Sequence, residues 1–109
     1  MEYKVIIAAL KPNFTDKVVD AAKACGISGA TIIPGRGTGM GEARTFIGLT
    51  LEAQTDVVIF LTEVALVDPV MAAIEEAGRL DEHGTGVVFV LAVERVAGIK
   101  EEIVRQEPV

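Results

Sequence analysis

Two strand–helix–strand patterns follow one another along this chain, and that order restricts the fold more than any other feature of the sequence. Four apolar runs have the length of β-strands, and they occupy residues 3–10, 29–34, 56–62 and 87–94. Segments with apolar side chains at helical spacing separate the first run from the second and the third from the fourth. We therefore predict an α+β, ferredoxin-like βαββαβ sandwich, with a four-stranded antiparallel sheet and both helices on one face.

Residue types that favour helix ends mark both helical segments. Asn13 is a preferred N-cap, and Gly26 stands where the first helix should end. For the second helix, Asp68 and Pro69 form an N-cap and N1 pair, and Gly78 marks the end. These signals predict helices over about 14–25 and 69–77.

The strand-like runs are apolar at successive positions instead of alternating with polar residues. This holds for residues 5–10, 57–61 and 87–93. An antiparallel sheet with one solvated face should alternate, and two helices on one face leave the other uncovered. We expect further copies of the chain to cover that second face, in a homo-oligomer. The alternative is that these side chains stay exposed, as many apolar atoms do in folded proteins.

Composition excludes several classes of protein. The 109 residues suffice for a single domain, 1–109, and the net charge of −6 argues against nucleic acid as a partner. No apolar run approaches the roughly 18–20 residues of a membrane span, so direct membrane insertion is not expected. The first residues do not resemble a secretory signal, and a single cysteine gives no disulfide framework. We expect a cytoplasmic protein.

The tripeptide Gly-Thr-Gly occurs twice, at residues 37–39 and 84–86. Glycines on both sides of a small hydroxyl residue expose backbone amides, and such loops can wrap an anion or a phosphate. Neither copy belongs to a Walker A motif, which excludes a P-loop ATPase. Taken alone, the second copy is equally explained as a helix-to-strand turn that needs a positive φ. If the fold brings both copies together, a ligand-sensing protein is the better interpretation.

A long connection separates the second strand from the third. Pro34 is expected to close the strand before it, and residues 35–54 are expected to lack regular structure. Connections of this length are uncommon in compact domains and tend to be functional. Arg36 and Arg44 within it suit a phosphate or a carboxylate. The alternative is a flexible hairpin tip whose arginines are only solvated.

No residue pattern typical of an active site or a metal site occurs. His83 is the only histidine, and its acidic neighbours are adjacent to it rather than spaced for chelation. Ser28 and Cys25 have no plausible base beside them in the sequence. We therefore expect a non-enzymatic protein with no metal site.

Several short motifs occur in an order that resembles the P-II signalling proteins, and together they span the chain to about Lys100. They are Lys11-Pro12, Gly-Ile-Ser-Gly-Ala-Thr at 26–31, the alternating glycines of 35–39, Gly-x-Gly-Val-Val-Phe-Val at 84–90, and Val-Glu-Arg-Val at 93–96. The resemblance implies a ferredoxin-like homotrimer that binds adenine nucleotides reversibly in clefts between subunits. It also implies a long mobile loop, the T-loop, at residues 35–55 and a C-terminal tail at 98–109.

The same resemblance implies roles for individual residues. Those expected to bind the nucleotide or a related anion are Thr31, Gly35, Arg36, Gly37, Thr38, Gly39, Gly84, Thr85, Gly86, Arg95 and Lys100. Thr38 and Thr85 are expected to donate their hydroxyls to the ligand. Within the loop, Glu42, Arg44 and Phe46 are expected to contact the partner, a membrane transporter or a metabolic enzyme.

The sequence departs from the P-II pattern at positions that serve a triphosphate. Where P-II proteins carry a lysine, arginine or glutamine near the ligand, this chain has Met40, Gly41, Asp56, Val87 and Gly98. The implied ligand is an adenine nucleotide with fewer phosphates than ATP, namely ADP or AMP, or else a cyclic nucleotide or a small anion. Phe46 replaces the tyrosine that is uridylylated in some members, so that switch is expected to be absent.

The leading hypothesis is a trimeric sensor whose ligand sets the order of residues 40–54 and thereby controls partner binding. Three alternatives from other classes stay open. They are a metal-handling trimer of the same fold, like the divalent-cation tolerance proteins, an amino-acid-binding regulatory module, and a slow nucleotide hydrolase. Metal-dependent melting would favour the first alternative, and release of a hydrolysis product would favour the last.

Overall fold

The computed structural model describes residues 2–37, 44–46, 49–51 and 53–99. Its elements, in chain order, are β1 (Tyr3–Leu10), α1 (Pro12–Ala24), β2 (Thr31–Gly37), β3 (Arg44–Phe46), β4 (Leu49–Leu51), β5 (Ala53–Glu63), the 3₁₀-helix η1 (Val64–Leu66), α2 (Val67–Ala77) and β6 (Gly86–Ala92).

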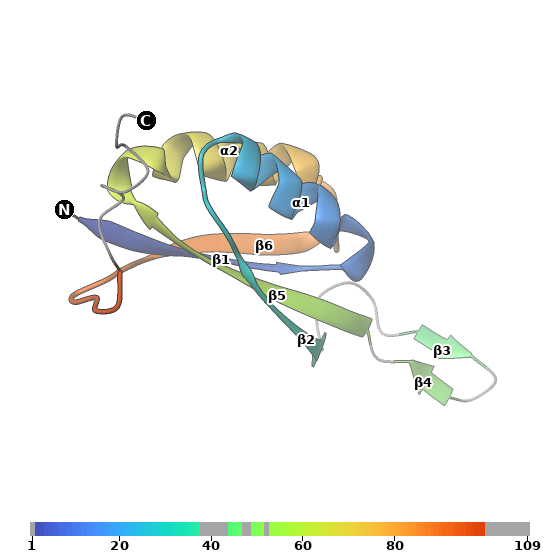
Figure 1. The fold of residues 1–109 in the computed structure, drawn as a ribbon. Coiled ribbons are helices and arrows are strands. Elements are labelled where there is room, and N and C mark those ends of the chain that lie inside the picture. Colours follow the sequence, from blue (N-terminus) through green and yellow to red (C-terminus); the bar gives the residue numbers. More distant parts are fainter. Residues whose placement is uncertain (1, 38–43, 47–48, 52, 100–109) are drawn as a thin grey trace.

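The main sheet has four strands in the order β2-β5-β1-β6, and every neighbouring pair is antiparallel. Helices α1 and α2 lie side by side on one face of this sheet, as Figure 1 shows. The predicted ferredoxin-like α+β sandwich is therefore confirmed. A second sheet pairs β3 with β4, beyond the end of the main sheet in Figure 1.

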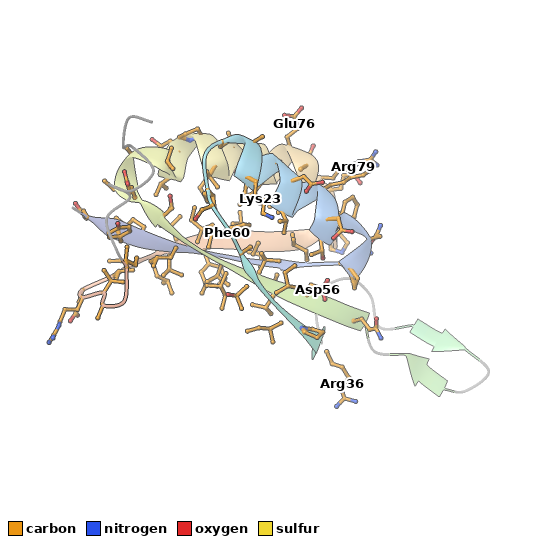
Figure 2. The ribbon with its side chains drawn as sticks, viewed as in Figure 1. Lys23, Arg36, Asp56, Phe60, Glu76 and Arg79 are labelled. Carbon is orange, nitrogen blue, oxygen red and sulfur yellow. The ribbon has the colours of Figure 1, made fainter. Side chains whose placement is uncertain are left out.

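The core lies between the two helices and the inner face of the sheet. Along β1 the burial alternates, and Ile6, Ala8 and Leu10 are fully buried. Phe60 of β5 is the bulkiest of the fully buried side chains and pairs with Ile6 across the strands, under the helices in Figure 2. Burying a side chain of this size stabilises the folded state by roughly 1.5–3 kcal/mol. The core therefore determines which side chains of each strand face the helices. The helices contribute Val18, Ala22, Val70 and Ile74.

Both helices begin two residues earlier than predicted, and no side chain caps either of them. Helix α1 begins at Pro12, whose fixed φ suits the first helical position, so Asn13 lies inside the first turn. Helix α2 begins at Val67, because η1 leads directly into it. The N-caps predicted at Asn13 and Asp68 are therefore wrong. Asp68 still lies in the first turn, where its carboxylate complements the helix dipole.

Gly78 ends α2 as predicted, but the residue with left-handed backbone is Arg79, at φ 53°. The amides of Arg79 and Leu80 donate to carbonyls of the last helical turn, which is the Schellman pattern. Glycine also suits the close packing at position 78, since a Cβ there would lie 3.1 Å from the Ile74 carbonyl oxygen and 3.3 Å from the Val18 side chain of α1.

Strands β2 and β5 run past their predicted ends and form a two-stranded ribbon. β2 continues through Pro34 to Gly37, and β5 begins at Ala53. The prediction that Pro34 closes the strand is therefore wrong. Among the described strands β2 pairs only with β5, and such an edge tolerates proline because the missing donor is not needed there. The connection 35–54 likewise contains regular structure, namely both strand ends and the β3–β4 hairpin.

The face of the sheet opposite the helices, called the open face below, is apolar and accessible. Between 39% and 49% of the surface is exposed for its large side chains Ile33, Leu61, Val87, Phe89 and Leu91. Figure 1 shows both helices on the other side of the sheet. The prediction that the sheet is apolar on both faces is confirmed, and among the described residues the open face has no covering layer.

Candidate functional site

The two glycine loops lie at the same end of the sheet but at its opposite edges. The strand registers align Pro34 of β2, Asp56 of β5, Leu10 of β1 and Gly86 of β6 in one row across the sheet. Three strand spacings, or about 14 Å, separate the two ends of this row. Within one chain the loops therefore flank the end of the sheet and do not touch each other.

The row one residue further toward this end of the sheet contains a lysine, and it lies between the two glycine segments. Gly35 pairs with Thr55, and the β1–β5 register continued by one residue places Lys11 beside Thr55. On the other side, the amide of Lys11 donates to the carbonyl oxygen of Thr85 at 3.2 Å. Lys11 is half-buried and makes no ion pair with the described residues. This row, called the Lys11 row below, gives the site a positive charge flanked by glycine backbone.

Asp56, a carboxylate on the row beside the Lys11 row, is hydrogen-bonded to a residue of helix α1. The Thr15 hydroxyl of α1 donates to Oδ2 of Asp56 at 2.7 Å. This bond ties the start of α1 to β5 and holds the carboxylate toward the helix face, where Figure 2 shows it beneath α1. Asp56 is therefore committed to the helix face of the sheet.

The loop around Thr85 is held by its own hydrogen bonds. Thr85 is 5% exposed, and its hydroxyl donates to the carbonyl oxygen of Arg79 at 2.6 Å, with the Glu82 carbonyl 3.2 Å away. A threonine hydroxyl carries one proton, so this proton is used within the loop. The prediction that Thr85 donates its hydroxyl to a ligand is therefore not what the structure shows. Gly84 has a φ of 80°, which fits a turn that only glycine adopts easily.

Gly86 is required by the packing of β6 against β1. A Cβ at this position would lie 2.5 Å from the Ala9 carbonyl oxygen and 3.3 Å from Cα of Leu10. Both atoms belong to backbone that cannot move without disturbing the central strand. The glycine therefore has a structural reason to be there, whether or not its amide also meets a ligand.

The end of β2 lies next to a buried polar atom. Thr55 is 6% exposed, and its Oγ1 has no hydrogen-bond partner. A Cβ at Gly37 would lie 2.6 Å from that oxygen, so the absence of a side chain at Gly37 makes room for the hydroxyl. Buried hydroxyls are nearly always hydrogen-bonded, which makes this one an unusual feature of the site.

A groove of about 650 Å³ lies on the helix side of β6, between that strand and the end of α2. Its lining includes three carboxylates, Glu75, Glu76 and Asp81, against the single guanidinium of Arg79. This excess of negative charge disfavours a phosphate or carboxylate ligand there. The Lys11 row is therefore the better place for an anion.

The remaining predicted site residues do not come together within one chain. Thr31 lies in a central row of the sheet, opposite Ile59, and Arg95 follows β6 at the far end of the sheet. Arg36 lies near the end of β2 and extends away from the helices in Figure 2. Arg44 and Phe46 form the ends of β3. Outside the described residues lie Thr38, Gly39, Glu42 and Lys100.

The sequence reasoning did not assign a binding role to Lys11 or Thr55. Lys11 was visible only as part of a Lys-Pro motif, and its place between the loops depends on the strand registers. Thr55 carries no sequence signal, because an isolated threonine at a strand end is ordinary. The positions of both residues in the site depend on the registers of β1, β2 and β5.

The described residues also bear on other functional classes. No three of their histidine, cysteine, aspartate and glutamate side chains are grouped so that they would hold a metal ion. The Cys25 thiol lies 3.7 Å from the Pro69 carbonyl oxygen, at the contact between the two helices. In the described part of the chain, no helix is both long and apolar enough to cross a membrane.

The fold and the site together define a ferredoxin-like sandwich with a glycine-flanked cationic end, extended by a β-ribbon. Residues 3–103 match the family described as Nitrogen regulatory protein P-II. The chain belongs to this family of signalling proteins, which confirms the resemblance inferred from its motifs.

Individual relatives agree with this assignment. The chain is 29% identical over 102 residues to a Nitrogen regulatory protein P-II of Rhodospirillum rubrum and 30% identical over 102 residues to one of Azospirillum brasilense. Each alignment covers 89% of this chain and 91% of the relative. A solved structure of Arabidopsis thaliana PII bound to citrate superimposes with a TM-score of 0.65 at 26% identity, covering 84% of this chain and 78% of that one.

Proposed function

We propose that this protein is a cytoplasmic homotrimeric sensor that binds a small anion at the Lys11 row and regulates a partner transporter or enzyme. The ligand is an adenine nucleotide, ADP or AMP before ATP, or a small carboxylate of the citrate kind. The observation that carries this proposal is the position of Lys11, half-buried and without an ion pair to the described residues, between two loops of bare glycine backbone. An anion there would meet a positive charge and exposed amides together.

Two observations support a site shared between copies. The open face carries five large apolar side chains that a trimer would bury. Thr31 and Arg95 lie away from the Lys11 row within one chain, so they reach a ligand only if a neighbouring copy supplies them. A cleft between subunits satisfies both requirements with one arrangement.

The limited positive charge of the site supports a ligand smaller than a triphosphate. Val87 and Asp56 stand where P-II proteins carry lysines, and Asp56 is hydrogen-bonded on the helix side. The acidic groove beside β6 adds further negative charge nearby. Regulation then follows from linkage. A ligand that binds more tightly to one conformation of the β2–β5 ribbon raises the population of that conformation, and with it the form of the protein that the partner meets.

The test combines oligomeric state with ligand binding. Light scattering after size exclusion should give a mass of three chains, and Phe89→Asp on the open face should lower it. Thermal shift and calorimetry with ADP, AMP, ATP, citrate and divalent cations should show stabilisation by at least one of the anions. A monomer, or stabilisation by metal ions alone, would contradict the proposal and favour the metal-handling alternative.

A further inference from the structure

The hydroxyl of Thr55 is the most unusual polar group in the described part of the chain. Thr55 is only 6% exposed. Its Oγ1 lies next to Gly37 and has no hydrogen-bond partner. The three other buried threonines, Thr15, Thr62 and Thr85, each donate to a carbonyl or a carboxylate. Thr55 alone among the four keeps its donor unused.

The position of this donor connects the Lys11 row to the ribbon. Thr55 belongs to the row, since it pairs with Gly35 on one side, and the β1–β5 register, which ends at Leu10 and Asp56, would continue with Lys11 on the other. Gly37, the last residue of β2, lies against its hydroxyl, since a Cβ there would be 2.6 Å from Oγ1. Because Oγ1 is inaccessible, an acceptor can reach it only if the groups around it move, and Gly37 is one of those groups.

We propose, resting on the anion-binding function above, that Thr55 is a ligand-contacting residue that couples binding to movement of the β2–β5 ribbon. A carboxylate or phosphate oxygen held near Lys11 accepts the hydrogen bond from Oγ1. Gly37 is displaced from above the hydroxyl, and the end of β2 moves with it. The unpaired hydroxyl of the free protein favours the bound state, because binding supplies the missing acceptor.

A valine at position 55 separates this role from a structural one. Thr55→Val keeps the shape and removes the unpaired hydroxyl, so the free protein should melt at the same or a higher temperature. Affinity for ADP or citrate, measured by calorimetry on the full chain, should fall roughly tenfold or more. Thr62→Val is the matched control, since Thr62 is equally buried on the same strand but toward its other end. Thr55→Ser keeps the hydroxyl and should retain most of the affinity.

A second pair of variants tests the coupling. Gly37→Ala places a Cβ 2.6 Å from Oγ1, so it should displace the end of β2 and raise amide exchange at residues 35–37 without ligand. Gly35→Ala is the control, because its Cβ would meet only the Thr55 carbonyl, at an ordinary 3.7 Å. In the unmodified protein, ADP or citrate should raise the same exchange, and in Thr55→Val it should not.

The outcomes distinguish the two proposals. If the unmodified protein binds none of the anions, the proposed function fails and the role of Thr55 fails with it. If the unmodified protein and Thr55→Val bind equally well, the function stands and the role of Thr55 is overturned. Weak binding by both Thr55→Val and Thr55→Ser would also overturn it, because the hydroxyl would then not be the group that matters.

Discussion

Two glycine-containing segments, the end of β2 at residues 35–37 and the loop at residues 84–86, lie at the same end of the sheet, yet they are built in opposite ways. In the second loop the Thr85 hydroxyl is bonded to a carbonyl at 2.6 Å, and Gly86 is fixed by its contact with β1. In the first loop the Thr55 hydroxyl has no partner and the glycine above it ends a ribbon. Similar glycine spacing therefore accompanies an internally hydrogen-bonded loop in one place and, on our proposal, a displaceable strand end in the other. The following variants test that contrast, from the largest expected effect to the smallest.

Gly86→Val should have the largest effect and act on the fold. Its Cβ would lie 2.5 Å from the Ala9 carbonyl oxygen, so the edge strand must separate from β1 or distort it. We expect a loss of about 3 kcal/mol in the free energy of unfolding, measured by urea denaturation. Gly35→Ala at the other loop should change it by less than about 1 kcal/mol. Equal losses at both positions would contradict the idea of one rigid and one adjustable loop.

Thr85→Val should destabilise the rigid loop. The substitution removes the donor to the Arg79 carbonyl and leaves a nearly buried loop without its internal bond. The expected cost is about 1–3 kcal/mol in thermal or urea unfolding. Thr55→Val, with no bond to lose, should cost nothing or stabilise. Thr85→Val should therefore lower the free energy of unfolding, and Thr55→Val should not. If Thr55→Val lowered it as much as Thr85→Val, the proposed difference between the two segments would be wrong.

Lys11→Gln should weaken anion binding with little effect on the fold. Lys11 stands between the two loops, and removing its charge should lower the affinity for ADP or citrate by about tenfold, or roughly 1.4 kcal/mol. Calorimetry at two salt concentrations should also show a weaker salt dependence than in the unmodified protein. Lys17→Gln, an exposed lysine of α1, is the matched control. The same affinity in both variants would place the anion elsewhere.

Arg79→Gly should give the smallest effect, and in the stabilising direction. Arg79 holds a left-handed backbone at φ 53°, which costs an L-residue energy that glycine avoids. We expect the free energy of unfolding to rise by about 0.5–1 kcal/mol, seen as a higher melting temperature. The carbonyl that accepts the Thr85 hydroxyl is retained, so the loop should keep its structure. A clear loss of ligand affinity would instead show that the guanidinium takes part in binding.

Much of the fold was predictable because local patterns carry it. The four apolar runs and two amphipathic segments gave the element order, and Gly78 was correctly predicted to end α2. The errors fell where a local signal competed with a contact from elsewhere. Pro34 is a strand breaker by itself, but pairing with β5 holds it in an extended edge strand. Asn13 is a good N-cap, but the proline before it starts the helix.

The sequence by itself determined the ferredoxin-like topology and the apolar character of both sheet faces, because these depend on residue order and periodicity, and its ordered motifs showed the resemblance to the family. Only the tertiary structure decided that Lys11 lies beside Thr85 and that the Thr85 hydroxyl donates to a carbonyl of its own loop. It also decided that the Thr55 hydroxyl is buried without a hydrogen-bond partner. Each of these facts depends on which residues face one another across strands distant in the chain. That register is set by burial of the core as a whole, and no single segment contains it.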